Sequence, residues 1–219
     1  MGYSYHYNSI GGAIINNTIA SNSYSIRFNF ESAGNIMYAL SKATNIRKNS
    51  DGEYAILGIP YAQYVKGEFD FSKNIRIDRR NSFAFHIGMG IAVPYGNAKT
   101  IPFEKQYFSG GANSVRGWTV RDLGPGSFVR NENTNLLDQS GDIKLDASIE
   151  YRSKLFWKFQ GAIFVDAGNI WTIRDYDNQP GGVFKFNKFY KQIAVAYGLG
   201  LRLDLDFFIP VSYTHLTLP

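Results

Sequence analysis

Apolar and polar residues alternate along much of this 219-residue chain. In the segment 142–152 the even positions are charged or polar, and the odd positions hold Ile143, Leu145, Ala147, Ile149 and Tyr151. The same period of two recurs in the segments 24–31, 82–93 and 193–207. Because successive side chains of a strand point to opposite faces, these segments predict β-strands with one apolar and one polar face. No segment keeps a helical period over four turns, so the sequence predicts an all-β fold.

The alternation also predicts which side chains share a face of the sheet. We expect an outward, convex surface that carries Tyr24, Phe28, Phe85, Ile87, Ile149, Leu201 and Leu203. We expect a concave side that carries Arg27, Glu31, Glu150, Asp166, Arg202 and Asp204. A shift of one residue in any strand would reverse its two faces.

The connections between the predicted strands alternate in length. Tight turns are predicted around 78–81 and 153–157, and long polar loops at 34–51, at about 94–141 and after Trp171. Short turns at one end and long loops at the other are typical of an outer-membrane barrel, in which the apolar face meets lipid. Several strands also reach about ten residues, the length that a tilted transmembrane strand needs. The connection from Asn8 to Asn22 is longer than this pattern predicts.

A soluble β-sandwich remains an alternative at this point, because it too has strands with one apolar and one polar face. Aromatic residues near the strand ends favour the barrel, whose membrane interfaces are lined by aromatic girdles. These residues are Tyr3, Tyr5, Tyr61, Tyr64, Tyr151, Trp157 and Trp171. No apolar run approaches the length of a transmembrane helix.

Composition excludes several functional classes. The chain has no cysteine, and its net charge of +5 comes from scattered basic residues rather than a basic patch, so no nucleic-acid partner is expected. His6 and His86 look isolated on polar strand faces, so we expect no metal site and no cofactor. No nucleophile lies in a recognisable catalytic frame. We therefore expect that the protein is not an enzyme.

The most informative segment is the long loop at about 94–141. Its centre reads Gly110-Gly111-Ala112-Asn113-Ser114-Val115-Arg116-Gly117-Trp118, with one cation, Arg116, among glycines that permit unusual backbone conformations. Aromatic residues before and after it supply the apolar surface that disordered segments lack. We therefore predict a tightly folded loop.

The loop resembles the conserved loop of the BamA/TamA outer-membrane assembly family, also called the bacterial surface antigen family. The hallmark of that family is a Val-Arg-Gly-aromatic tip after a Gly-Gly pair, matched here by Val115, Arg116, Gly117 and Trp118 after Gly110 and Gly111. The segment 161–171 is similar to a family strand that follows the loop, and Glu150 fits as an acidic strand residue. The continuation 123–127 is more similar to TamA than to BamA.

This resemblance implies a transmembrane antiparallel up-and-down β-barrel of about sixteen strands, preceded by periplasmic POTRA domains. Residues 1–209 would supply a partial barrel of about seven strands. The resemblance also implies that the loop folds into the lumen, where Arg116 meets acidic strand residues. Independently, the alternation places Glu150 and Asp166 on the polar face. The competing interpretations are that Arg116 is a solvated surface cation and that Asp166 caps a turn.

The two ends of the chain are expected to be unnatural. Residues 3–7 already alternate as in the middle of a strand, so the N-terminus is expected not to be the natural one. Residues 210–219 resemble a sequencing-adapter or cloning scar. We expect this tail to pack poorly and to pair little. Half a barrel has two open edges, so this chain alone is not expected to function.

The leading functional hypothesis is a fragment of a bacterial outer-membrane barrel that inserts or translocates envelope proteins. The expected partners are outer-membrane lipid, client outer-membrane proteins, and envelope assembly partners that bind through POTRA domains. Two alternatives are a two-partner secretion pore of the same superfamily and a soluble all-β binding module.

Overall fold

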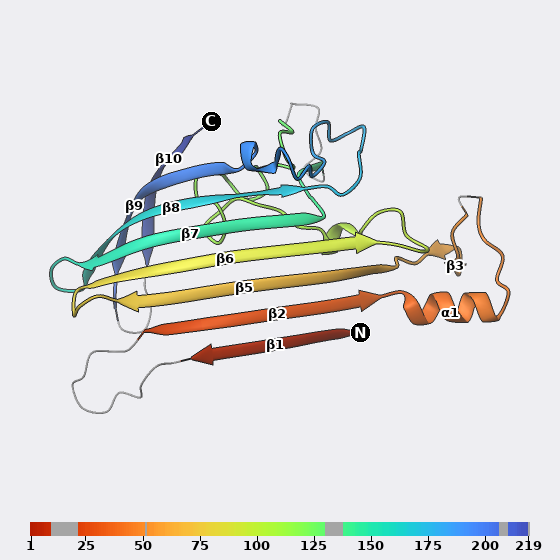
Figure 1. The fold of residues 1–219 in the computed structure, drawn as a ribbon, viewed down its shortest axis with the longest axis horizontal. Coiled ribbons are helices and arrows are strands. Elements are labelled where there is room, and N and C mark those ends of the chain that lie inside the picture. Colours follow the sequence, from red (N-terminus) through yellow and green to blue (C-terminus); the bar gives the residue numbers. More distant parts are fainter. Residues whose placement is uncertain (10–21, 51, 130–137, 206–209, 219) are drawn as a thin grey trace.

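The computed structural model describes residues 1–9, 22–50, 52–129, 138–205 and 210–218. Its main element is one curved sheet of eight strands (Figure 1). In chain order the strands are β1 (Gly2–Ser9), β2 (Ser23–Ala33), β5 (Tyr64–Arg76), β6 (Asn81–Pro94), β7 (Ile143–Lys154), β8 (Phe159–Trp171), β9 (Ala194–Leu203) and β10 (Val211–Leu218). A separate hairpin pairs β3 (Ala55–Ile56) with β4 (Ile59–Pro60).

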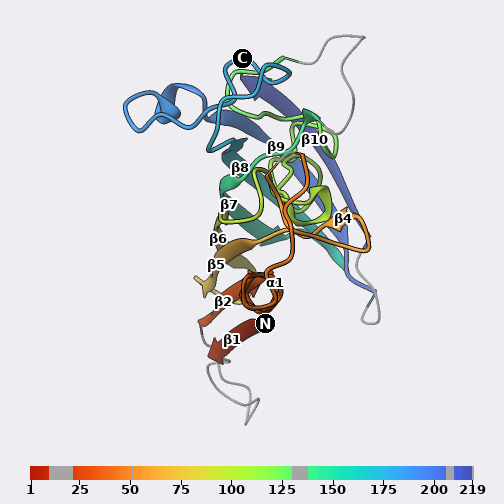
Figure 2. The same ribbon diagram turned by 90° about the vertical axis from the view of Figure 1, so that its right-hand side faces the viewer.

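Each strand of the large sheet pairs antiparallel with its neighbour in the sequence. The predicted meander is therefore confirmed, and the described strands contain none of the crossings that a Greek-key sandwich requires. Within the described residues, pairing stops at β1 on one side and at β10 on the other. The sheet is an open, curved wall, as expected of part of a barrel (Figure 2).

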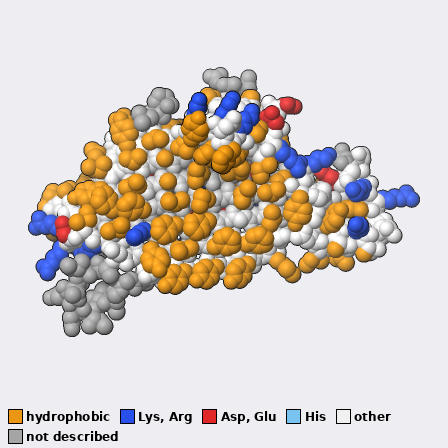
Figure 3. All heavy atoms as spheres, viewed as in Figure 1, with side chains coloured by type: hydrophobic (Ala, Val, Ile, Leu, Met, Phe, Trp, Pro, Cys, Tyr) orange, Lys and Arg blue, Asp and Glu red, His pale blue; other side chains and the backbone are white. Residues whose placement is uncertain are grey.

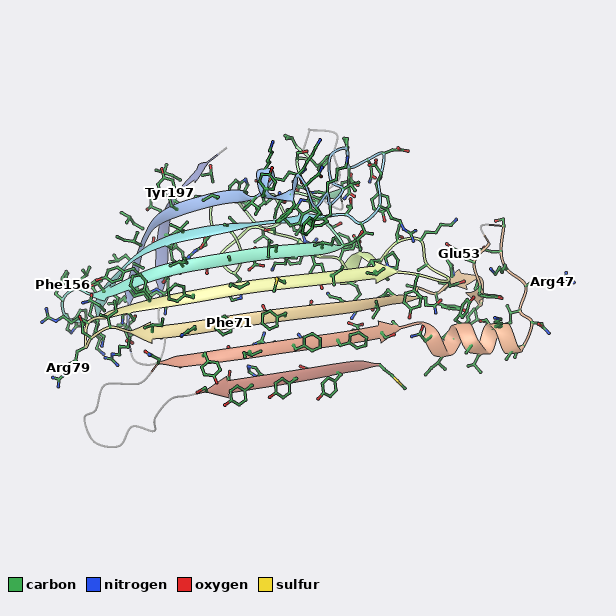
Figure 4. All side chains as sticks on the ribbon, in the orientation of Figure 1. Arg47, Glu53, Phe71, Arg79, Phe156 and Tyr197 are labelled. Atoms are coloured by element: carbon green, nitrogen blue, oxygen red, sulfur yellow. The ribbon has the colours of Figure 1, made fainter. Side chains whose placement is uncertain are left out.

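The register confirms the predicted faces. Cross-strand partners share a face, and one such row runs Arg27, Asp70, Gly88, Asp146 and Gly168 on the concave side. On that side Glu150 and Asp166 are 4% and 0% exposed. The outward residues are exposed apolar side chains, and they include Tyr24, Phe28, Ile87, Ile149 and Leu201. Figure 3 shows this outward surface as largely hydrophobic, and Figure 4 shows Phe71 and Tyr197 on it.

The predicted loop at 34–51 contains an element that the sequence analysis missed, the helix α1 (Asn35–Ala43). The helix has nine residues, which is too short to produce a hydrophobic period over four turns. It follows Gly34, whose φ of 80° suits glycine, and a Cβ there would collide with Gln63. Short 3-10 turns occur at η1 (Phe103–Lys105) and η3 (Phe189–Lys191). Among the described residues, no helix combines the length and the apolar character needed to cross a membrane.

The tail differs from expectation. Residues of β10 pair with β9 over eight positions, from Val211 opposite Arg202 to Leu218 opposite Val195. The prediction that this tail would pair little is therefore wrong, and the sheet has eight strands rather than about seven. Val, Tyr and Thr favour strands, and the free edge of β9 offers unpaired backbone groups to such a segment. The origin of residues 210–219 as a scar stays a prediction. Most of the connection from Asn8 to Asn22 lies outside the described residues.

Substitution at the centre of β6 tests which face meets the bilayer. In the full protein folded into lipid vesicles, Ile87→Arg places a charge on the exposed outward face and is expected to lower the free energy of unfolding by roughly 2–4 kcal/mol. Ser72→Arg, on the concave face opposite His86, is expected to cost less than about 1 kcal/mol. Denaturant titration measures both values. A larger loss for Ser72→Arg would mean that the polar face contacts lipid.

Candidate functional site

The connection from β6 to β7 folds back on the concave side of the sheet (Figure 2). Two antiparallel bridges give it a fixed path, from Tyr107 to Gly141 and from Ser109 to Leu123. The ring of Tyr107 lies directly on β6, because a Cβ at Gly90 would be only 2.5 Å from the ring. The ring packs in an apolar cluster with Ile170 of β8, which is 0% exposed. The loop is therefore packed along the wall, as predicted.

The loop tip is a compact turn built on its glycines. The backbone amide of Gly111 donates to the carbonyl of Trp118 over 2.8 Å. Gly110 and Gly111 have φ values of 100° and 84°, in the region that favours glycine. Val115 is 0% exposed and packs with Leu123, Ala196 and Trp118. Each of these features restricts the conformation of the backbone around Arg116.

Gly117 allows the tip to approach the wall. A Cβ at this position would lie 2.6 Å from both Ala196 Cβ on β9 and Thr217 Cγ2 on β10. Any side chain larger than hydrogen would push the tip away from these strands. The glycine after Arg116 is thus required for contact, not for an unusual φ.

Arg116 lies between the two predicted carboxylates. Asp166 accepts three hydrogen bonds from it, from the backbone N at 3.0 Å and from Nε and Nη2 at 2.7 Å each. Glu150 accepts a fourth bond from Nη1 over 2.5 Å. The three side chains are only 7%, 0% and 6% exposed, in the order Arg116, Asp166, Glu150. The forked guanidinium matches two carboxylates on adjacent strands, as its geometry allows.

Aromatic rings cover the guanidinium. Its Cζ lies 3.6 Å from the ring centroid of Phe164 and 4.9 Å from that of Tyr213. These two rings pack edge to face at 5.4 Å. Phe164 is 1% exposed, so the cation sits in an environment with little water, where cation–π attraction is strongest.

Two further arginines complete the cluster. Glu150 also accepts hydrogen bonds from Arg152 Nε at 2.8 Å and from Arg202 Nη2 at 2.6 Å. Burial opposes the charge on Arg116, but the hydrogen bonds to Asp166 and Glu150 outweigh it and raise the pKa of Arg116 above its ordinary value. The guanidinium therefore stays charged at every physiological pH. Such a group holds parts together and does not transfer protons.

The sequence analysis missed part of this cluster. It placed Arg202 on the concave face but assigned neither Arg202 nor Arg152 to the site. It also missed Phe164 and Tyr213. A signal for Phe164 was present, because it is a large aromatic residue at a position where the alternation in 159–171 expects a polar one. Tyr213 was missed because its segment was set aside as a scar.

His86 is not isolated, contrary to expectation. Its Nε2 lies 3.5 Å from Asp70 Oδ1 and its Nδ1 lies 3.4 Å from Asp146 Oδ2. The two carboxylates flank Gly88 in one cross-strand row, and the missing side chain at Gly88 leaves room for them. Within the described residues, no group of three or more His, Asp or Glu side chains is arranged to hold a metal ion.

Comparison with known proteins agrees with the barrel interpretation of the fold. The model of the Omp85 superfamily domain matches residues 16–213. This chain belongs to the Omp85 superfamily. The predicted membership of the BamA/TamA family is confirmed, and the chain is placed in the bacterial outer membrane. The alternative of a soluble binding module is wrong, whereas the closer similarity to TamA stays a prediction.

Two individual proteins illustrate the relationship. The outer membrane protein assembly factor BamA of Neisseria meningitidis serogroup B is 34% identical over 99 residues, which are 41% of this chain and 12% of that protein. The crystal structure of BamA from Haemophilus ducreyi lacking POTRA domains 1–3 shares the fold, with a TM-score of 0.56 and 17% identity, over 99% of this chain and 50% of that chain. The chain thus spans half or less of each.

Removal of the Arg116 guanidinium tests its contribution to the loop. Arg116→Ala leaves two buried carboxylates without their partner and is expected to cost about 3–5 kcal/mol. Arg116→Lys should recover only part of this, because an ammonium cannot bond both carboxylates in one plane. Protease cleavage within the loop of the folded full protein measures the effect. Arg47→Ala, at an exposed cation that Figure 4 shows pointing away from the fold, is the control. If the loop were equally protected from the protease in both variants, Arg116 would be an ordinary surface cation.

A double-mutant cycle separates the buried pair from an exposed one. Arg116 and Asp166 are expected to couple by about 2–3 kcal/mol, at the upper end of values for residues in contact. Lys105 Nζ and Glu31 Oε1 are equally close at 2.7 Å, but their side chains are 40% and 33% exposed. That pair should couple by about 1 kcal/mol or less. Equal coupling energies would show that burial of the cluster adds nothing.

Proposed function

We propose that this chain is part of an outer-membrane barrel that inserts or translocates envelope proteins, and that the Arg116 cluster fastens the inward loop in its working position. The observation that carries this proposal is the burial of one loop cation against two carboxylates of adjacent strands. Breaking such a buried pair is costly, so the loop is a fixed brace rather than a mobile lid. The proposal assigns no catalytic role to any residue.

The brace has a defined target on the wall. Glu150 belongs to β7 and Asp166 to β8, while Gly117 contacts β9 and β10. One loop tip therefore touches four consecutive strands. We infer that its contacts with β7, β8 and β9 hold the curvature of this part of the wall while other strands of the barrel move. A barrel that opens a seam for client strands needs such a rigid part.

The mechanism we propose for the clients is strand addition at an exposed barrel edge. The edges of β1 and β10 have no further partner within the described residues, and an unpaired edge is not tolerated in lipid. We therefore propose that the working protein has further strands and that periplasmic POTRA domains deliver clients to it. The partners are outer-membrane lipid, client outer-membrane proteins and the envelope assembly partners bound through those domains.

Client insertion tests the proposal. The full protein is reconstituted in vesicles, and the folding of a small outer-membrane barrel into them is followed by its shift in gel mobility. Arg116→Ala is expected to reduce the insertion rate well below that of Arg47→Ala, with Arg116→Lys between the two. Equal insertion rates in all three variants would contradict the role of the cluster. A full protein that inserts no client but exports a partner substrate would replace the proposal with a two-partner secretion pore.

A further inference from the structure

A groove of about 490 Å³ crosses the outward, lipid-facing surface near the long-loop end of the strands. It arises because Gly67 supplies no side chain in an outward row between Phe30 and Ile91. A Cβ at Gly67 would meet no atom within 4 Å. The walls are apolar side chains of β2, β5, β6 and β7, and they include Phe28, Phe69, Met89, Ile143 and Leu145.

One end of the groove is roofed by aromatic rings. The connection from β8 to β9 projects from the convex side of the sheet (Figure 2) and brings Phe184 and Phe189 to the groove beside Trp171. The centroid of Trp171 lies 5.6 Å from that of Phe184 and 6.3 Å from that of Phe189. Trp171 Nε1 also donates to Gln192 Oε1 over 2.9 Å. The roof is thus a packed structure fixed to the wall.

Three lysines stand on this roof. The segment 183–192 reads Val-Phe-Lys-Phe-Asn-Lys-Phe-Tyr-Lys-Gln and contains no acidic residue. Lys185, Lys188 and Lys191 are all exposed, and none forms an ion pair with the described part of the chain. Figure 3 shows blue Lys and Arg side chains gathered above hydrophobic ones near the upper edge of the outward face. The apolar groove therefore ends at a segment that carries three exposed lysines.

We propose that this groove binds one acyl chain of an anionic phospholipid, whose headgroup is held by Lys185, Lys188 and Lys191. The charge supports an anionic headgroup, because a lysine near a membrane surface attracts anionic lipid. The apolar lining supports an acyl chain. The position excludes a client strand as the occupant, since the groove lies on the face of the sheet, where the backbone of a peptide would find no hydrogen-bond partners.

Photo-crosslinking tests the proposal with the full protein in nanodiscs. The probes are phosphatidylglycerol and phosphatidylcholine, each with a diazirine in one acyl chain and used at equal mole fraction. Mass spectrometry maps the adducts. The anionic probe is expected to label peptides of β6 and β7 that line the groove at least about fivefold more than the zwitterionic probe. Equal labelling by the two probes would mean ordinary surrounding lipid only and would overturn the proposal.

Two variants separate the groove from the lysines. Gly67→Leu places a side chain in the groove at a position where a Cβ meets no atom within 4 Å, and it should lower labelling there severalfold while leaving labelling elsewhere unchanged. Its control is Gly161→Leu, at an outward glycine where a Cβ makes only an ordinary contact with Leu155. Unchanged groove labelling in Gly67→Leu would overturn the proposal.

The triple variant Lys185→Gln, Lys188→Gln and Lys191→Gln should abolish the preference for the anionic probe, whereas Lys73→Gln at the other end of β5 should keep it. A preference that persists in the triple variant would also overturn the proposal. Heat-dependent gel mobility establishes that each variant is folded. If Gly67→Leu does not fold, two results still test the proposal: the preference between the two probes in the unaltered protein, and its loss in the triple variant.

Discussion

The structure depends on the neutralisation of one buried cation. Arg116 lies 50 residues before Asp166 in the sequence, and it donates three hydrogen bonds to that one carboxylate. A guanidinium in such a dry place is stable only if nearly all its donors are satisfied. This requirement explains the second carboxylate, Glu150, and the rings of Phe164 and Tyr213 that cover the remaining surface.

Close approach of the loop to the wall is the second constraint, and glycine meets it at separate points. Gly90 receives the ring of Tyr107, and Gly117 lies against Ala196 and Thr217. Neither position has the positive φ that usually explains a glycine. Their role is to provide space, because the side chains of Tyr107, Ala196 and Thr217 lie where a Cβ would be. The concave side is therefore shaped by absent side chains as much as by charged ones.

Strand positions and faces could be predicted from the sequence because lipid and lumen place opposite demands on successive residues. The same parity identified Glu150 and Asp166, and the loop motif pointed to Arg116. Contacts that depend on register across several strands could not be predicted in this way. Arg202 of β9 reaches across β8 to Glu150 of β7. No local sequence pattern indicates that these two residues are in contact. The tail was misjudged for another reason, since the free edge of β9 pairs with residues whose likeness to an adapter said nothing of their strand propensity.

Docking of the loop also depends on the correct pairing of the sheet. Glu150 and Asp166 come from two different strands, and they meet Arg116 only when β7 and β8 are in register. A slip of one residue in β8 would turn Asp166 toward lipid and bring Val165 or Ala167 to the cation. The contacts join residues far apart in the sequence, and such non-local contacts are slow to form. Docking of Arg116 is thus a checkpoint that a mispaired wall fails.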